Sequence, residues 1–143
     1  MTPQRVTLLT LGVSDLQSSK NFYGAMGWTP TSEVEGQVVF YQINGLVFGL
    51  FGLAPLAKDQ GRPDAKLGTG ALTLAQNFTT EAEADDAYAL ALKCGATALK
   101  APEKVFWGGY SGYYADPDGH VWEVAMNPFW QLNTDGSLTL PEA

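Results

Sequence analysis

Glu123 is the residue of this chain whose type and position are best suited to chemistry. It lies in a predicted strand, His120–Met126, where it shares one side with the small residues Val121 and Ala125. The other side of that strand carries three bulky apolar residues, which suit packing under a helix. Glu123 is therefore expected on the opposite, concave face, where a carboxylate is costly unless it is paired, protonated or bound to another group.

Three roles are open for Glu123, the one candidate catalytic residue. It could be structural and accept hydrogen bonds from Thr10, Thr73, Asn77 or a buried water. It could anchor a ligand that carries a positive charge or a hydrogen-bond donor, with aromatic walls adding cation–π attraction. It could also act as a general acid or base.

The histidine and cysteine content limits which metal and disulfide sites the chain can form. The chain has one histidine and one cysteine. His120 follows a tight turn and is expected at the rim or in solvent, and Cys94, at a helix end, is expected to be a small buried hydrophobe. One cysteine excludes an internal disulfide framework and a multi-cysteine metal site, and one histidine excludes a two-histidine metal site within the chain.

Aromatic residues are numerous enough to line an apolar pocket with one polar anchor. In the stretch Trp107–Tyr110, two glycines permit a tight loop that could lay Trp107 or Tyr110 over the mouth of a cavity. Alternation along the strands should turn only some of the aromatics inward. The candidates are Phe40, Phe48, Phe51, Trp107, Tyr110, Tyr113 and Tyr114.

The elements that position these residues occur twice in the same order: a strand, a helix and three strands. The first module, 1–53, is expected to contain a helix that opens with a capping box at Ser14 and Gln17 and ends at Gly27. Its predicted strands are Val6–Val13, Trp28–Val34, Gln37–Ile43 and Leu46–Leu53.

The second module, 70–127, follows a stretch rich in proline, glycine and charge, 54–69, which we interpret as an exposed linker. Its helix opens with a capping box at Thr80 and Glu83 and ends at Gly95, and a tail, 128–143, follows the module. The predicted strands are Gly70–Phe78, Ala96–Lys100, Tyr110–Ala115 and His120–Met126. The two halves predict an α+β fold of two βαβββ modules, and duplication is supported by an echo between residues 8–11 and residues 71–74.

Alternation along the first strand of each module divides its residues between two faces. In the first module, Leu9, Leu11 and Val13 suit the helix side. In the second, the corresponding set is Leu72, Leu74 and Phe78. The concave faces then receive Leu8, Thr10 and Gly12 from the first strand and Ala71, Thr73, Ala75 and Asn77 from the second.

Composition excludes several classes of protein. The 143 residues carry 15 acidic against 8 basic side chains, a formal net charge of −7, and 45% are hydrophobic. This excludes a disordered tail protein and argues against nucleic-acid backbones and anionic membranes as partners. The apolar stretch Val6–Val13 is too short to cross a bilayer. With a lone thiol, the chain is expected to be a leaderless, cytoplasmic protein.

Two segments resemble a known family. The stretch Leu11–Leu16, followed by Ser19, Phe22 and Tyr23, is similar to the opening of glyoxalase/bleomycin-resistance/extradiol-dioxygenase proteins, the vicinal oxygen chelate superfamily. The stretch Asp116–Val124 resembles their closing signature. The resemblance spans nearly the whole chain and implies a glyoxalase-like open barrel with a concave pocket. It says little about activity, because this fold hosts many chemistries.

The resemblance also implies where a metal would be held. The family's four ligand positions fall on Leu8, Gly49, Ala71 and Glu123, of which only Glu123 has a donor side chain. A stable site needs at least two or three protein ligands. We therefore expect no metal and no cofactor.

Taken together, the sequence predicts a protein that binds a small molecule, cationic or aromatic, without the family metal site. The alternative is a lyase or dioxygenase of the superfamily that uses Glu123 as acid or base, or an atypical metal site. The expected partners are a small-molecule ligand and a second copy of the chain, with Phe129 and Trp130 covering the body or the dimer partner. The predicted ligand pocket consists of Leu8, Thr10, Phe40, Gly49, Phe51, Ala71, Thr73, Trp107, Tyr110 and Glu123.

Overall fold

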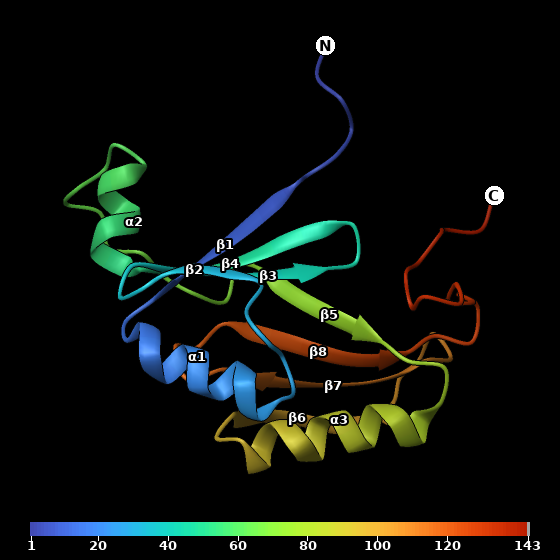
Figure 1. The fold of residues 1–143 in the computed structure, drawn as a ribbon. Coiled ribbons are helices and arrows are strands. Elements are labelled where there is room, and N and C mark those ends of the chain that lie inside the picture. Colours follow the sequence, from blue (N-terminus) through green and yellow to red (C-terminus); the bar gives the residue numbers. More distant parts are fainter. Residues whose placement is uncertain (143) are drawn as a thin grey trace. The chain divides into compact units, whose positions relative to one another are not determined.

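The structure, a computed structural model that describes residues 1–142, contains the predicted order of elements twice (Figure 1). The α+β fold of two βαβββ modules is thereby confirmed. One additional helix, α2, follows β4 in the sequence and belongs to the first compact unit. The elements are β1 (Leu8–Val13), α1 (Leu16–Ala25), β2 (Ser32–Val34), β3 (Val38–Ile43), β4 (Leu46–Gly52), α2 (Leu53–Asp59), β5 (Thr73–Asn77), α3 (Glu81–Lys93), β6 (Thr97–Lys104), β7 (Tyr110–Ala115) and β8 (Val121–Met126).

The chain divides into two compact units, Met1–Gly68 and a second unit that begins at Thr69. The first unit holds a sheet with strand order β1-β4-β3-β2, and the second a sheet with order β5-β8-β7-β6. In each sheet the first and last strands of the module are parallel neighbours, and the other pairs are antiparallel. The two modules therefore share one topology.

The core of the first unit lies between α1 and one face of its sheet. Phe22 and Tyr23 of α1 are buried, and the ring of Tyr23 meets that of Phe48 edge-on at 5.4 Å between centroids. Leu11 and Val13 of β1 are buried as well, as the alternation predicted. This burial of apolar surface is the main force that fixes which face of the sheet the helix covers.

The core of the second unit repeats this arrangement with α3 packed against β7 and β8. Ala84 and Ala91 give α3 a smooth, fully buried side. Trp122 and Val124 of β8 are buried, which confirms that the bulky side chains of this strand form its packed side. Small residues on the helix and large ones on the sheet together fill the space between them.

The two long helices begin at residues whose side chains cap them. Thr80 caps α3, and its hydroxyl oxygen accepts from the backbone N–H of Glu83 at 3.1 Å, as predicted. The prediction for α1 was wrong by one residue, because Asp15 rather than Ser14 is the N-cap. The Asp15 carboxylate accepts from the backbone N–H of Ser18 at 3.0 Å.

The segment 54–69, predicted to be an exposed linker, contains α2. The first of its two prolines, Pro55, lies in the first turn of this helix, where proline is tolerated. Leucines of α2 pack over β1: a Cβ on Gly12 would lie 2.9 Å from Cδ2 of Leu53 and 3.1 Å from Cδ2 of Leu56. α2 therefore covers one end of the sheet face that α1 leaves open.

Strand β6 is longer than predicted and irregular. It continues past Lys100 to Lys104 and includes Pro102, which an edge strand can accept because one side of it needs no amide donors. Its pairing with β7 shifts register twice. At Gly112 the two strands approach so closely that a Cβ would lie 2.6 Å from the backbone nitrogen of Pro102.

Over residues 1–142, none of the helices combines the length and the apolar character that a membrane span requires.

Candidate ligand-binding face

Glu123 lies at the centre of the open face of the second sheet. In the strand register it stands directly opposite Ala75 of β5 on one side and Tyr113 of β7 on the other. Residues directly opposite each other point to the same face of a sheet. The row Ala75–Glu123–Tyr113 thus occupies the face away from Trp122 and Val124, the face that alternation in β8 predicts for Glu123.

Tyr113 is the polar partner of Glu123. Burial raises the pKa of the Tyr113 phenol, and the charge of Glu123 and a hydrogen bond to its carboxylate raise it further. The phenol therefore stays protonated beside the carboxylate. The structural partners that the sequence suggests are Thr10, Thr73, Asn77 or a buried water, and Tyr113 is not among them.

The sequence held a signal for this pair. The turn at 116–119 joins two strands that begin their pairing at Ala115 and Val121. Counting two residues back along one strand and two forward along the other brings Tyr113 opposite Glu123. Hairpin register fixed by the turn would have identified the pair.

The neighbours of Glu123 other than Tyr113 are small. Val121 and Ala125 flank it on β8, and Ala75 stands across from it on β5. The next row of the face is Asn77–Ala125–Ser111, which adds an amide and a hydroxyl. Ala125 and Ser111 of that row are buried, so the accessible part of the face beside the carboxylate is on the side of Ala75, which is exposed.

Tyr110, predicted to line the pocket, lies on the other face of this sheet. Its hydroxyl donates to the Asp85 carboxylate of α3 at 2.6 Å, and this hydrogen bond is the first cause that raises the pKa of Tyr110 to about 12. In the register it pairs with Met126. Tyr110 is three positions from Tyr113, and an odd separation along a strand reverses the face, so the prediction was wrong.

Trp107 lies at the end of the second sheet, in the turn between β6 and β7. The turn is closed by a hydrogen bond from the backbone N–H of Val105 to the carbonyl of Gly109 at 2.9 Å. A Cβ on Gly109 would overlap the indole of Trp107, so the ring rests on this glycine. Continuing the alternation from Ser111 places that side of Gly109 on the Glu123 face, which puts Trp107 at its border.

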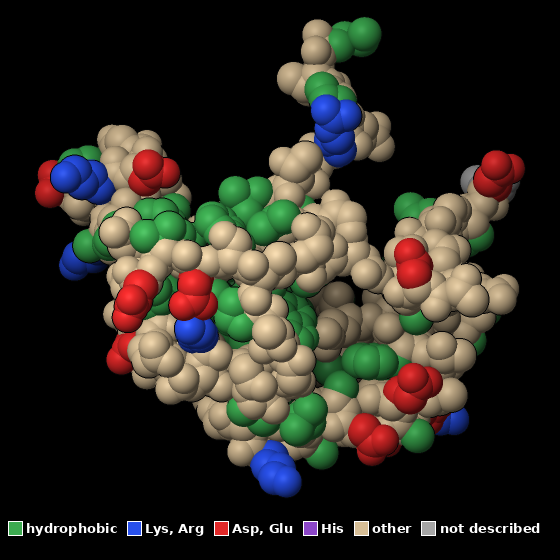
Figure 2. Space-filling view, viewed as in Figure 1, with side chains coloured by type: hydrophobic (Ala, Val, Ile, Leu, Met, Phe, Trp, Pro, Cys, Tyr) green, Lys and Arg blue, Asp and Glu red, His purple; other side chains and the backbone are tan. Residues whose placement is uncertain are grey.

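The five residues predicted from the first sheet share its open face. Thr10, Gly49 and Phe40 form one row, in which a Cβ on Gly49 would lie 3.2 Å from the Phe40 ring. Leu8 and Phe51 stand in the rows on either side. Apolar side chains gather over β1 and β4 on the side away from α1 (Figure 2). This face has no carboxylate.

The first strands and the helices of the two modules correspond at an offset of 65 positions. The echo between residues 8–11 and residues 71–74 implies an offset of 63 (71 − 8). Asp15 and Thr80, the N-caps of α1 and α3, are separated by 65 (80 − 15), and so are Leu8 and Thr73, the first residues of β1 and β5 (73 − 8). Ala71 precedes β5 and is exposed, so the counterpart of Leu8 is Thr73.

This offset matches the rows of the two open faces. Thr10 corresponds to Ala75, and their partners in the register then match Gly49 with Glu123 and Phe40 with Tyr113.

The residues at the family's metal positions do not fit a metal ion. With Thr73 in place of Ala71, they are Leu8, Gly49, Thr73 and Glu123, which supply one carboxylate and one hydroxyl. Nowhere in residues 1–142 do three or more His, Cys, Asp or Glu side chains form a group that could hold a metal. A divalent ion needs more charged or imidazole donors than this set provides.

His120 and Cys94 lie outside this face. The backbone N–H of His120 donates to the buried carboxylate of Asp116 at 2.9 Å, which ties it into the turn before β8. Both side chains are half-buried rather than fully exposed or fully buried.

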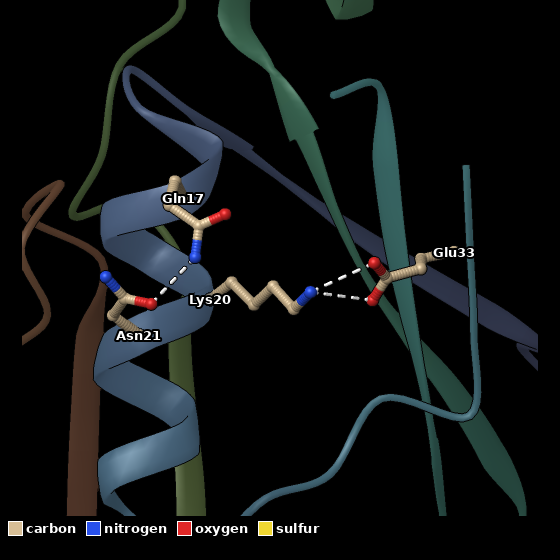
Figure 3. Close-up of polar contacts among 4 residues, drawn as sticks. All are labelled: Gln17, Lys20, Asn21 and Glu33. Atoms are coloured by element: carbon tan, nitrogen blue, oxygen red, sulfur yellow. Dashed lines mark hydrogen bonds and ion pairs between the residues drawn. The ribbon is translucent and has the colours of Figure 1, made fainter. Parts of the chain in front are cut away.

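A second polar cluster lies on the first unit, between α1 and β2 (Figure 3). Lys20 forms an ion pair with Glu33 at 2.9 Å, and the side-chain amide of Gln17 donates to that of Asn21 at 2.8 Å. A shallow depression of about 150 Å³ beside them includes Gln17, Lys20 and Glu33 in its lining. Such an exposed pair adds little stability, and it ties α1 to an edge strand.

Comparison with known proteins gives consistent results. Residues 5–124 match the model of the Glyoxalase/Bleomycin resistance protein/Dioxygenase superfamily. A glyoxalase-related enzyme from Fulvimarina pelagi is 36% identical with a TM-score of 0.91, covering 98% of this chain and 100% of its own. A lactoylglutathione lyase from Agrobacterium tumefaciens is 22% identical with a TM-score of 0.67, covering 89% and 96%, and shares the fold. No curated protein matched the chain.

Proposed function

Because this chain belongs to the glyoxalase/bleomycin resistance protein/dioxygenase superfamily, we propose that it binds a small cationic or aromatic molecule on the open face of the second sheet, without the metal of the superfamily's enzymes. The observation that carries this proposal is the row Ala75–Glu123–Tyr113. It combines one carboxylate, one phenol and a small neighbour on a face that α3 does not cover.

Charge and shape support the proposal. The net charge of −7 gives the protein a negative potential, which favours cations. Tyr113 beside the carboxylate and Trp107 at the border of the face supply aromatic surfaces for cation–π contacts. The side chain of Ala75, the neighbour of Glu123 on β5, is small and exposed, so it does not obstruct a flat group beside the carboxylate.

Calorimetric titration with benzamidine, an aromatic cation, tests the proposal. Glu123→Gln keeps the shape of the side chain and removes its charge, so we expect binding to weaken roughly 10- to 100-fold, which corresponds to one hydrogen bond to a charged group. Glu103→Gln is the matched control, because Glu103 is an exposed carboxylate on β6 that pairs with Lys100. Equal affinities of wild type and Glu123→Gln would contradict the proposal.

The metal-free part of the proposal has its own measurement. Protein purified without chelator is incubated with Ni, Zn, Mn and Fe(II), and its metal content is determined. We expect no stoichiometric metal. About one equivalent per chain that is lost on Glu123→Ala would overturn this part and favour an atypical metal site.

An enzyme of the superfamily is the second candidate, since the 36% identical protein from Fulvimarina pelagi is described as a glyoxalase-related enzyme. Here Glu123 would be the acid or base, and the Tyr113 phenol, whose pKa burial and the charge of Glu123 raise, holds a proton next to it. Slow conversion of a bound probe, followed by NMR and absent in Glu123→Gln, would favour this candidate over binding alone.

The proposal includes a homodimer in the cytoplasm, with no nucleic-acid or membrane partner. Phe129 and Trp130 are 68% and 38% exposed, and burial against a second copy would remove this apolar surface from water. The acidic balance and the single cysteine support the other two parts. Sedimentation equilibrium measures the oligomeric state.

A further inference from the structure

The first unit contains a cavity between the segment that follows α1 and the end of β3. Its volume is about 200 Å³, and its lining consists of Trp28, Thr29, Tyr41, Gln42 and Ile43. Tyr41 is only 2% exposed, whereas Thr29 and Gln42 lie at the surface. The cavity therefore extends from solvent, beside two polar side chains, to the aromatic core of this unit.

The wall formed by Trp28 follows from the way α1 ends. Gly27 has a φ of 104°, and the backbone N–H of Trp28 donates to the carbonyl of Tyr23 at 2.9 Å, which is the Schellman arrangement of a helix end. This turn brings the indole back onto the helix, with its ring centroid 5.5 Å from that of Tyr23. The rings of Trp28 and Tyr41 lie 5.8 Å apart at an angle of 64°, so two aromatic walls meet at the cavity.

The second unit ends its helix in the same way and has no such wall. Gly95 has a φ of 111°, and the backbone N–H of Ala96 donates to the carbonyl of Ala91 at 2.9 Å. Ala96 thus stands where Trp28 stands in the first unit. The shared topology does not require a large aromatic side chain at this place, and the indole is a feature of the first unit alone.

Tyr41 also carries an unused hydrogen-bond donor. Its hydroxyl is buried, and no group of residues 1–142 forms a hydrogen bond with it. Burial, and after it the charge of Glu33, raises the pKa of the Tyr41 phenol, which therefore keeps its proton. A buried donor without an acceptor costs free energy, and an acceptor on a ligand would recover it.

We propose that this cavity is a second binding site, for an uncharged molecule with one aromatic ring and a carbonyl group that accepts a hydrogen bond from Tyr41. All five lining residues are uncharged, so a charged ligand would lose its hydration without gaining a counter-charge. A cavity of about 150 Å³ is enough for benzene, and this one has room for a ring with a small substituent. The site lies in the first unit and does not depend on the proposed function of Glu123 in the second.

Two fluorinated probes of similar shape test the role of the hydroxyl. Para-fluoroacetophenone carries a carbonyl, para-fluoroethylbenzene has hydrocarbon in its place, and fluorine NMR follows the titration of both. We expect Tyr41→Phe to weaken binding of the ketone roughly fivefold, the effect of about one hydrogen bond, and to leave binding of the hydrocarbon unchanged. Tyr114→Phe is the matched control, because Tyr114 is a buried tyrosine at the equivalent place of the second sheet and should keep the wild-type affinities.

Thermal unfolding of the free protein gives a second readout. Tyr41→Phe removes a buried hydroxyl that has no partner, so we expect a melting temperature equal to or higher than that of wild type. A lower melting temperature would show that the hydroxyl is already used in the free protein and would overturn the inference. Trp28→Leu removes one aromatic wall and should weaken binding of both probes; unchanged affinities in this variant would also overturn it.

Competition separates this site from the face that carries Glu123. Binding of the ketone that Tyr41→Phe weakens, and that excess benzamidine leaves unchanged, would support the inference. Binding of neither probe at millimolar concentration, or equal ketone affinities of wild type and Tyr41→Phe, would overturn it and leave the function proposed for Glu123 standing. Displacement of the probes by benzamidine would assign them to the Glu123 face and would overturn the second site.

Discussion

The two sheets have the same topology and differ most on their open faces. In the first, the central row is Thr10–Gly49–Phe40, and in the second the equivalent row carries a carboxylate and a phenol. All three positions differ: the second row gains a carboxylate at Glu123 and a phenol hydroxyl at Tyr113, and it loses the hydroxyl of Thr10, where Ala75 stands. Because the strands pair in the same register, each position on one open face has an equivalent on the other. The residue types at a few of these positions decide which face can bind a polar group.

The packed sides of the same strands are alike. In the matched register of the two sheets Tyr41 corresponds to Tyr114 and Phe48 to Trp122, and all four rings are buried. Packing against a helix requires large apolar side chains at these places in both units. The open faces have no such requirement, which explains why the differences gather there.

Leu50→Ala and Val124→Ala test whether the packed sides are equivalent, and they carry the largest expected effects. Both residues are completely buried at corresponding positions. We expect Leu50→Ala to lower the free energy of unfolding by about 2–5 kcal/mol, and Val124→Ala, which removes less volume, by about 2 kcal/mol. Urea unfolding measures both. A negligible effect at Val124, matching that of the exposed control Leu99→Ala, would break the comparison.

Comparing Gly112→Ala with Gly49→Ala tests whether glycine is required where the neighbouring backbone, rather than a side chain, occupies the space for a Cβ. The new Cβ at Gly112 meets backbone of β6, so we expect a cost of about 1–3 kcal/mol in the free energy of unfolding. At Gly49 it meets the Phe40 ring at 3.2 Å, and a gain of about 0.4–1 kcal/mol from the unfolded chain should offset that contact. Similar losses in thermal unfolding of both variants would show that the close approach of β6 is not what demands glycine.

The N-caps of α1 and α3 also differ between the two units. Replacing them should have the smallest effect on stability, and only the effect at Asp15 should depend on pH. Thr80→Ala should lower the free energy of unfolding by about 1 kcal/mol at any pH. The backbone N–H of Ser18 holds the pKa of Asp15 below its ordinary value of 3.8, so the stability from this cap is complete above that value and is lost as pH falls through the lower, folded pKa.

Unfolding followed by circular dichroism at pH 7 and at lower pH measures this difference. Asp15→Asn should keep the cap and remove its dependence on pH. A Thr80→Ala effect that changed with pH in the same way would contradict the assignment to Asp15.

Patterns of short range predicted much of the fold. Alternation in β1 and β8 assigned their faces correctly, because a period of two is a local property of the strand. The offset of 63 was wrong by two residues, an even number, so it kept Thr73 on its face and only moved it to another row. Ala71 fell outside β5 for the same reason.

Properties that depend on pairing between strands were harder to predict. The neighbour of Glu123 on β7 follows from the register of β7 with β8, which the pattern of a single strand does not contain. The side on which Tyr110 lies follows from its odd separation from Tyr113, whereas the glycines before it suggest a loop over a cavity. α2 was missed because Pro55 and Gly61 are typical of loops, although leucines around them pack over Gly12.

The irregular edge strand β6 has a consequence for behaviour at high protein concentration. A regular edge offers a row of free amides on which another extended chain can add, the first step toward fibrils. Here Pro102 removes one amide, two register shifts bend the row, and Lys100 and Lys104 bring charge to it. The irregular part of β6 that lies close to Gly112 thus also protects this edge of the second sheet against aggregation.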